Sequence, residues 1–389
     1  MLRVYLDNNA TTPVLPEVLD AMRPYFGEHF GNASSIHHHG QETRAAVERA
    51  RESVAELVGC RSSEIVFTSG GTEADNLAIF GLAKPGDHIL TSTIEHHAVM
   101  NACKHLEQKG CEVTSIPVDG RCQVDPDDVK RALRSNTKLI TIMLANNETG
   151  VVQPVEQIGK IAAEADVFFH TDAVQAAGKI PLDVSKIGCD LLTISGHKIH
   201  ASQGIGALYV RKGTLLEPML YGGSHERSRR AGTENVPGIV ALGKAAELAL
   251  TAFERGDDKK MAEMRDRLER ELLSQIEATG VNGEGAPRVP NTTNIYFDYI
   301  EGEALVIALD LKGLAVSTGA ACSSGSIEPS HVLTAMGLRP DRARASIRFS
   351  LGKQNKPEDV DSALSVVPET VAYLRELSPL WKQAPARTT

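Results

Sequence analysis

Residues 138–172 read KLITIMLANNETGVVQPVEQIGKIAAEADVFFHTD, and this stretch indicates the class of fold. Its two apolar runs, at 138–145 and 167–172, have the length and β-branched content of buried strands, and a helical pattern separates them. Similar strand-length runs occur at 64–69, 88–92, 111–117, 190–195 and 205–211. Short apolar strands that alternate with helices are typical of a largely parallel sheet covered on both faces. The sequence therefore predicts an α/β fold whose large domain contains a mostly parallel seven-stranded sheet.

The pattern changes after about residue 236. A long amphipathic stretch at 236–280 leads into loop-forming residues, which short strand patterns and further helices follow. This order predicts a smaller α+β domain, joined to the large domain through one long helix. The predicted large domain covers residues 13–255, and the small domain covers residues 1–12 and 256–389.

The composition excludes several classes of protein. The hydrophobic fraction of 42% and the charged fraction of 23% are close to the average of globular proteins, which argues against a disordered or fibrous chain. A net charge of −9 argues against nucleic acid as the main partner, because phosphate binding needs clustered cations. No apolar run approaches the roughly 18 residues of a membrane span, and the first residues lack the features of a signal peptide. We therefore expect a cytoplasmic protein with no membrane partner.

Polar side chains and glycines follow the predicted strands at the point where each strand ends. They are Gly71, Thr72, His96, Asn147, Asp172, Gln175, Ser195, His197 and Lys198. Because the carboxyl ends of parallel strands meet at one edge of a sheet, we expect these residues to surround a ligand there. Each residue also has an ordinary structural explanation: the glycine pair suits a turn, Asp172 suits a helix N-cap, and Lys198 suits a solvated turn.

The set as a whole indicates one cofactor. A glycine turn before a helix forms a phosphate cradle, and a lysine in a desolvated site forms a Schiff base with an aldehyde. A carboxylate pairs with a ring nitrogen, and an imidazole stacks on the ring. These are the requirements of pyridoxal 5'-phosphate (PLP).

Seven segments then resemble those of the cysteine desulfurases, in order and with similar spacing, from residue 4 to about residue 375. They are YLDNNATT (5–12), TSGGTE (68–73), ANNETGV (145–151), HTDAVQ (170–175), SGHK (195–198), RAGTE (230–234) and SIRFSL (346–351). These enzymes are PLP-dependent transferases of fold type I, in the class V aminotransferase superfamily. The segment STGAACSSGS (317–326) resembles the long-loop group, which contains the housekeeping and nitrogen-fixation-type enzymes.

The resemblance implies a role in cofactor binding for each residue at the strand ends. Lys198 holds PLP and later moves the Cα proton of the substrate, Asp172 pairs with the pyridine nitrogen, and Gln175 bonds the phenolic oxygen. His96 stacks on the ring and acts as an acid or base, and Asn147 lies beside the ring and the substrate. The phosphate-binding residues are Gly71, Thr72, Ser195 and His197, with Thr233 from the neighbouring subunit of a homodimer.

The resemblance also implies how the substrate, L-cysteine, is bound and attacked. Arg348 clamps its carboxylate, with Asn8 and Asn147 nearby, and Cys322 is the nucleophile that accepts its sulfur. Cys322 lies among glycine, serine and alanine, so we expect an exposed and mobile loop, where a thiol is a reactive candidate. A surface cysteine of no consequence is the alternative.

The expected reaction converts L-cysteine to L-alanine and a Cys322 persulfide. The persulfide then passes to an iron–sulfur scaffold or another sulfur acceptor protein. We expect no resident metal, although Cys322 could transiently ligate an iron–sulfur cluster, with a partner supplying the remaining ligands. The alternatives are a PLP-dependent selenocysteine lyase, a class V aminotransferase, or a non-catalytic protein that binds a sulfur scaffold.

Overall fold

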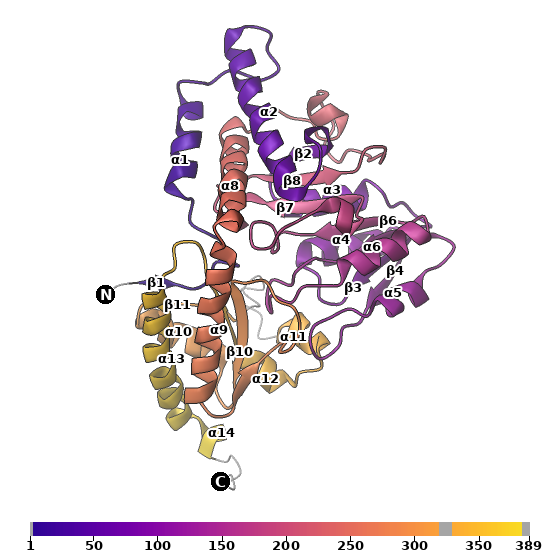
Figure 1. The fold of residues 1–389 in the computed structure, drawn as a ribbon. Helices are drawn as coiled ribbons and strands as arrows, with labels where there is room; N and C mark the ends of the chain where they lie inside the picture. The colour runs from indigo at the N-terminus through magenta and orange to yellow at the C-terminus, as the bar shows by residue number, and fades with distance from the viewer. Residues whose placement is uncertain (1–2, 319–328, 383–389) are drawn as a thin grey trace.

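The computed structural model describes residues 3–318 and 329–382 (Figure 1). A large α/β unit carries most of the first 250 residues, and a smaller unit, coloured orange to yellow, lies beside it. The N-terminal strand β1 (Val4–Tyr5) pairs with β11 (Leu314–Ala315) in the smaller unit. The chain therefore starts in the smaller unit before it enters the larger one.

The large unit is built on a seven-stranded sheet with the order β2-β8-β7-β6-β5-β3-β4. Only β8 runs against its neighbours, because β4, β3, β5, β6 and β7 pair in parallel. This confirms the predicted seven-stranded, mostly parallel sheet. The strands are β2 (Ile65–Thr68), β3 (His88–Ser92), β4 (Glu112–Ile116), β5 (Thr137–Thr141), β6 (Phe168–Asp172), β7 (Leu191–Ser195) and β8 (Gly206–Val210).

Helices cover both faces of this sheet, because successive strand residues are apolar on both sides. In β2, Ile65 and Phe67 pack into one core, and Val66 packs into the other. The first core is closed by α2 (His38–Val58), α5 (Pro126–Ala132), α6 (Val155–Glu164), α7 (Val184–Ile187) and α8 (Val236–Glu254). The second core is closed by α3 (Gly71–Phe80) and α4 (His97–Gln108).

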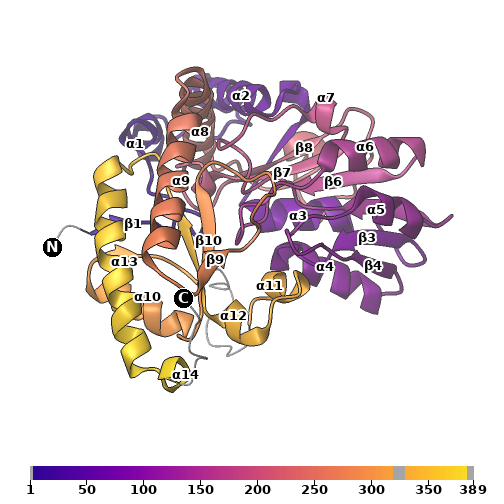
Figure 2. The same ribbon diagram turned by 60° about the horizontal axis from the view of Figure 1, so that its bottom comes forward.

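The smaller unit has its own core. Its antiparallel sheet has the order β12-β10-β9, and the buried side chains of Phe297 and Phe349 pack there against Leu268 and Leu305. The elements are α9 (Asp257–Gln275), β9 (Thr279–Val281), β10 (Thr292–Phe297), α10 (Gly302–Leu311), α11 (His331–Ala335), α12 (Pro340–Arg344), β12 (Ser346–Ser350), α13 (Pro357–Leu377) and α14 (Pro379–Lys382). Figure 2 shows α11 and α12 near α4, where Val332 and Leu333 meet Ile94 and Met143 of the large unit.

The expected single long helix at 236–280 is two helices. The first, α8, ends at Glu254, and α9 begins at Asp257 after Gly256, which has a left-handed backbone (φ 68°). Glycine enters this region at little cost, so the chain changes direction there. The two helices therefore belong to different units instead of forming one continuous connection.

Among the described residues, α8 is the one helix that is long and apolar enough to cross a membrane by length and composition. It packs against α2 and against α1 (Pro16–Met22), and its buried residues belong to the core of the large unit. Gly243 permits the close approach of α8 to α2, because a Cβ atom at that position would lie 2.6 Å from Cα of Ala50.

We predict that Gly243→Ala destabilises the protein by about 1 kcal/mol. Alanine favours a helix interior by about 1 kcal/mol relative to glycine, but the added methyl group forces apart two packed helices, which costs about 1–3 kcal/mol. Urea unfolding would measure the change, with the neighbouring Lys244→Ala as a control that should change stability by less than about 0.5 kcal/mol. A Gly243→Ala variant as stable as the parent would contradict this account of the packing.

Candidate active site

A cavity of about 300 Å³ lies at the carboxyl edge of the large sheet. The predicted residues that line it are Gly71, Thr72, His96, Asn147, Asp172, Gln175, Ser195, His197, Lys198 and Arg348. The first nine follow strands of the large sheet, and Arg348 comes from β12 of the smaller unit. The structure therefore brings together most of the candidate residues, and the site lies between the two units.

Asp172 is the last residue of β6 and is buried against the cavity. Its Oδ1 accepts a hydrogen bond of 2.8 Å from the backbone N–H of Val174. Burial raises the pKa of Asp172 to about 6, although that hydrogen bond and the charge of Lys198 oppose the rise. A cationic group in the cavity would lower this pKa again and pair with the ionised carboxylate.

Lys198 follows β7, at the end of the short 3-10 turn Gly196–Lys198. Its ammonium donates hydrogen bonds to the backbone carbonyls of Asn9 (2.5 Å) and Ala10 (2.7 Å). Nearby, Nδ1 of His197 lies 3.2 Å from the hydroxyl of Thr11. The amine is therefore held at the cavity wall by a segment from the beginning of the chain.

His96 is the N-cap residue of α4, and this role fixes its ring. Its Nδ1 accepts a hydrogen bond from the backbone N–H of Ala98 (3.1 Å), so the neutral imidazole carries its proton on Nε2. Burial, together with the charge of Lys198, lowers the pKa of His96 to about 4. The ring is therefore neutral at pH 7 and presents one N–H group to its surroundings.

The start of α3 forms another part of the cavity wall. This helix begins at Gly71, directly after β2, and Gly70 at its N-cap has no side chain to bond the first N–H groups. The amino end of a helix favours an anion, and Thr72 and Ser195 line the cavity at the same place. A Cβ atom at position 71 would lie 2.9 Å from Cγ2 of Val174, so a larger residue there would require that side chain to shift.

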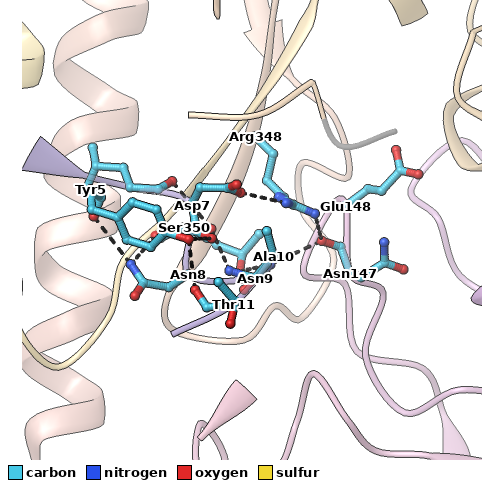
Figure 3. Close-up of polar contacts among 12 residues, drawn as sticks. Tyr5, Asp7, Asn8, Asn9, Ala10, Thr11, Asn147, Glu148, Arg348 and Ser350 are labelled. Carbon is cyan, nitrogen blue, oxygen red and sulfur yellow. Dashed lines mark hydrogen bonds and ion pairs between the residues drawn. The ribbon is translucent and has the colours of Figure 1, made fainter. Parts of the chain in front are cut away.

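Arg348 brings a guanidinium group to the cavity from β12 (Figure 3). Its Nη2 lies 2.7 Å from Oδ1 of Asp7, and its Nη1 donates to the carbonyl of Asn147 (2.9 Å). Its Nε is buried without a hydrogen-bond partner among the described residues. Each Nη atom carries a second hydrogen, so the guanidinium is held in one orientation and still has donors for a carboxylate.

Three candidates are not placed in the cavity. The side chain of Asn8 is 1% exposed; it donates to the carbonyl of Ser350 (2.9 Å) and accepts from Gln354 (2.8 Å), so it points away from the site. Its neighbour Asn9 lines the cavity instead and replaces it as a candidate. Thr233 is exposed and does not line this cavity. Cys322 lies outside the described residues.

Sequence reasoning missed two buried acids that interact electrostatically with Asp172. Asp75 lies on α3, three residues after Thr72, and burial together with the charge of Asp172 raises its pKa. Glu95 directly precedes His96, and its Oε1 accepts hydrogen bonds from the hydroxyl of Ser92 (2.5 Å) and the N–H of Met143 (3.0 Å). In the sequence, the position of Glu95 directly before His96 was the one signal for Glu95, and Asp75 had no such signal.

No group of three His, Cys, Asp or Glu side chains that could hold a metal ion occurs in residues 3–318 and 329–382. The groups that the cavity does offer are an amine, a carboxylate, an imidazole, a guanidinium and the start of a helix. This combination suits an amino acid and a phosphate-bearing aldehyde cofactor.

Comparisons with known proteins identify the family. Residues 4–363 match the family described as aminotransferase class-V. A cysteine desulfurase IscS of Dictyoglomus turgidum is 50% identical over 386 residues, which cover 97% of this chain and 98% of that protein. This chain belongs to the cysteine desulfurases of the class V aminotransferase family. The predicted family, fold type and enzymatic activity are thereby confirmed.

Solved structures of cysteine desulfurase relatives have the same fold. A NifS-like protein matches with a TM-score of 0.88 at 37% identity, over 96% of this chain and 100% of that one. The protein SspA, solved in complex with cysteine, matches with a TM-score of 0.79 at 38% identity, over 90% of this chain and 98% of that one. This chain therefore shares its fold with both of these solved proteins.

We predict that Glu95 makes the protein without cofactor less stable as the pH rises. Burial, together with the charge of Asp172, raises the pKa of Glu95 from 4.5 to about 8. The stability that neutral Glu95 contributes is complete below pH 4.5 and is lost as the pH rises to about 8. Relative to Glu95→Gln, which stays neutral, the parent should lose up to about 1.4 kcal/mol per pH unit in that window.

Urea unfolding of both proteins between pH 5 and about pH 8 measures this difference. Parallel pH profiles for the parent and Glu95→Gln would show that Glu95 is ionised in the folded protein and that this assignment is wrong.

Proposed function

We propose that this cysteine desulfurase uses PLP to convert L-cysteine to L-alanine and passes the sulfur to Cys322. The observation that carries the proposal is the convergence of Lys198, Asp172 and Arg348 on one cavity. The amine suits covalent attachment of an aldehyde, the carboxylate suits a ring nitrogen, and the guanidinium suits the carboxylate of an amino acid.

The residues present fit PLP. The uncapped start of α3, with Thr72 and Ser195, would hold the phosphate, and Asp172 would face the pyridine nitrogen. A cation beside Asp172 would lower its pKa again, so the carboxylate would ionise in the loaded enzyme. When bound, PLP supplies an electron-withdrawing ring that makes the Cα proton of an attached amino acid acidic.

Two basic groups of the chain can move that proton. As a neutral amine, Lys198 would take it on Nζ after giving up its hydrogen bonds to Asn9 and Ala10. His96 is neutral and exchanges protons only at Nε2, because Nδ1 is bonded to Ala98. Its low pKa means that it accepts a proton only briefly, which suits a group that returns the proton to the product.

The sulfur transfer balances without a further reactant. The Cβ–S bond of L-cysteine breaks, and an S–S bond forms between that sulfur and Sγ of Cys322. The carbon skeleton takes up a proton at Cβ and leaves as L-alanine. External thiols then reduce the persulfide to sulfide, or an iron–sulfur scaffold or other acceptor protein receives the sulfur.

The described cysteines are poor candidates for this role. Burial raises the pKa of the thiols of Cys60, Cys103 and Cys122 to about 12. A thiol with such a pKa is almost wholly protonated at pH 7, and the thiolate is the nucleophile. These values support Cys322, in the segment that resembles the long-loop group, as the acceptor.

We further propose that the enzyme is a cytoplasmic homodimer in which Thr233 completes the phosphate site of the partner subunit. Its loop is anchored by Glu226, whose carboxylate bonds both Nη atoms of Arg51 (2.7 and 2.8 Å). Glu226 and Arg227 have positive φ angles of 46° and 57°, a conformation that non-glycine residues adopt only when the surroundings enforce it. This anchoring supports an exposed loop with a defined shape.

The first experiment is the assay of both products. With PLP, L-cysteine and dithiothreitol, we expect equal amounts of alanine and sulfide. Lys198→Ala and Cys322→Ser should both abolish turnover, and Cys322→Ser should still hold the cofactor. Cys60→Ser is the matched control and should keep full activity. Sulfide from Cys322→Ser at the parent rate would refute the nucleophile, and a loaded enzyme that forms no sulfide would refute the proposed reaction.

Arg348→Lys tests recognition of the substrate carboxylate. A lysine cannot reach Asp7 and Asn147 while also meeting a carboxylate with two parallel donors. We expect kcat/KM for L-cysteine to fall about 10–100-fold, mostly through KM, which corresponds to one charged hydrogen bond of about 1.5–3 kcal/mol. Arg344→Lys, at a more exposed site on α12, is the control. An unchanged KM would exclude Arg348 as the carboxylate ligand.

A further inference from the structure

Lys179 is a buried lysine that does not line the active-site cavity. Its side chain is 9% exposed, and it lies behind Gln175, against a separate small cavity. Its Nζ donates hydrogen bonds to Oε1 of Gln175 (2.5 Å) and to Oδ1 of Asn9 (3.0 Å). Burying a lysine is costly unless its donors are satisfied, so these two contacts need an explanation.

The contacts decide which way the amide of Gln175 points. In its ammonium form Lys179 has only N–H donors, so it must face the oxygen of the amide. On the other side of the amide, Nε2 of Gln175 donates to the backbone carbonyl of Asn9 (3.0 Å), which can only accept. Two partners therefore require the same orientation of the Gln175 amide. Its nitrogen faces the backbone carbonyl of Asn9, and its oxygen faces Lys179.

We propose that Lys179 is a positioning residue that fixes the amide of Gln175 so that its N–H group faces the active-site cavity. Gln175 lines that cavity, and its nitrogen carries two hydrogens, of which Asn9 receives one. The second is then directed to a bound group. With the opposite orientation, Gln175 would present an oxygen and repel an anionic oxygen of the ligand.

The second contact of Lys179 ties its position to the smaller unit. Oδ1 of Asn9 also accepts from Nδ2 of Asn291 (3.0 Å), and Nδ2 of Asn9 donates to the hydroxyl of Thr292 (2.9 Å). The amide of Asn9 is thus fixed as firmly as that of Gln175. Docking of the smaller unit therefore sets the position of Lys179 and, through it, the orientation of Gln175.

The proposal holds for either charge state of Lys179. Burial lowers its pKa well below the ordinary value, and the charges of Lys198 and Arg348 lower it further. A neutral amine still has two N–H groups, which is the number that Gln175 and Asn9 accept. The backbone carbonyl of Asn9 can only accept, so it still requires the nitrogen of the Gln175 amide on its side. Orientation of the amide therefore does not require the ammonium form.

The consequence rests on the proposed function, in which Gln175 bonds the phenolic oxygen of PLP. A hydrogen bond to that oxygen makes it a weaker acceptor for the proton of the nitrogen that joins PLP to Lys198. Loss of the bond should therefore raise the pKa of that nitrogen. The visible absorption of the bound cofactor follows this protonation, so it reports the orientation of Gln175 without any assay of turnover.

The experiment is a pH titration of cofactor absorption in four proteins: the parent, Lys179→Met, Gln175→Leu and the double variant. We expect each single variant to raise the pKa of the linking nitrogen by about 1, a tenfold change in proton affinity. The double variant should show no further rise, because Lys179 acts only through Gln175. Lys186→Met, an exposed lysine on α7, is the control and should leave the titration unchanged.

The outcomes separate this inference from the proposed function. If Gln175→Leu leaves the pKa unchanged, the proposed contact of Gln175 with the cofactor is wrong. If Gln175→Leu raises it and Lys179→Met does not, or if the two changes add, the role of Lys179 is overturned. Thermal unfolding verifies that each variant is folded. If Lys179→Met does not fold, Lys179→Gln takes its place, because its shorter side chain cannot reach both oxygens and should shift the pKa in the same direction.

Discussion

The active site depends on the hydrogen bonds of one residue, Asn9, which lies between the two units. Its backbone N–H donates to the hydroxyl of Ser350 (3.0 Å), and its carbonyl accepts from Lys198 and Gln175. Its side-chain oxygen accepts hydrogen bonds from Lys179 and Asn291. Its side-chain nitrogen donates to the carbonyl of Asn147 and to the hydroxyl of Thr292. A buried polar group without a partner is costly, so these bonds fix the position of the smaller unit relative to the large unit. The cavity between the units therefore has a defined shape.

Desolvation sets the charge balance inside that cavity. It raises the pKa values of Asp75, Glu95 and Asp172 and lowers those of His96 and His197. All of these shifts favour the neutral form. A ligand that brings a cation to Asp172 and an anion to α3 would reverse part of that balance, since each charge would then have a partner. The site is therefore suited to a ligand that carries both charges at opposite ends.

The sequence predicted the sheet well because its strands are buried on both faces. Continuous apolar runs such as β5 and β7 differ clearly from the helices between them, and all seven strands were found within a few residues of their ends. The cavity residues at those strand ends were found for the same reason, since parallel strands end at one edge. Asn9 was missed and Asn8 chosen because the segment has no repeating pattern. Which of two adjacent asparagines faces the site depends on Ser350 and Gln354, more than 300 residues away.

The break at Gly256 was missed for a related reason. A single glycine in an amphipathic helical pattern is compatible with a continuous helix, and here the chain turns because α8 and α9 pack into different cores. The sequence by itself determined the layered α/β fold, the family and the chemical types of the residues at the strand ends, because these follow from local periodicity and motifs. Only the tertiary structure decided the contacts of Asn9, the orientation of Gln175 and the burial that shifts each pKa. These depend on how the two units pack against each other, and the groups that meet between the units are far apart in the chain.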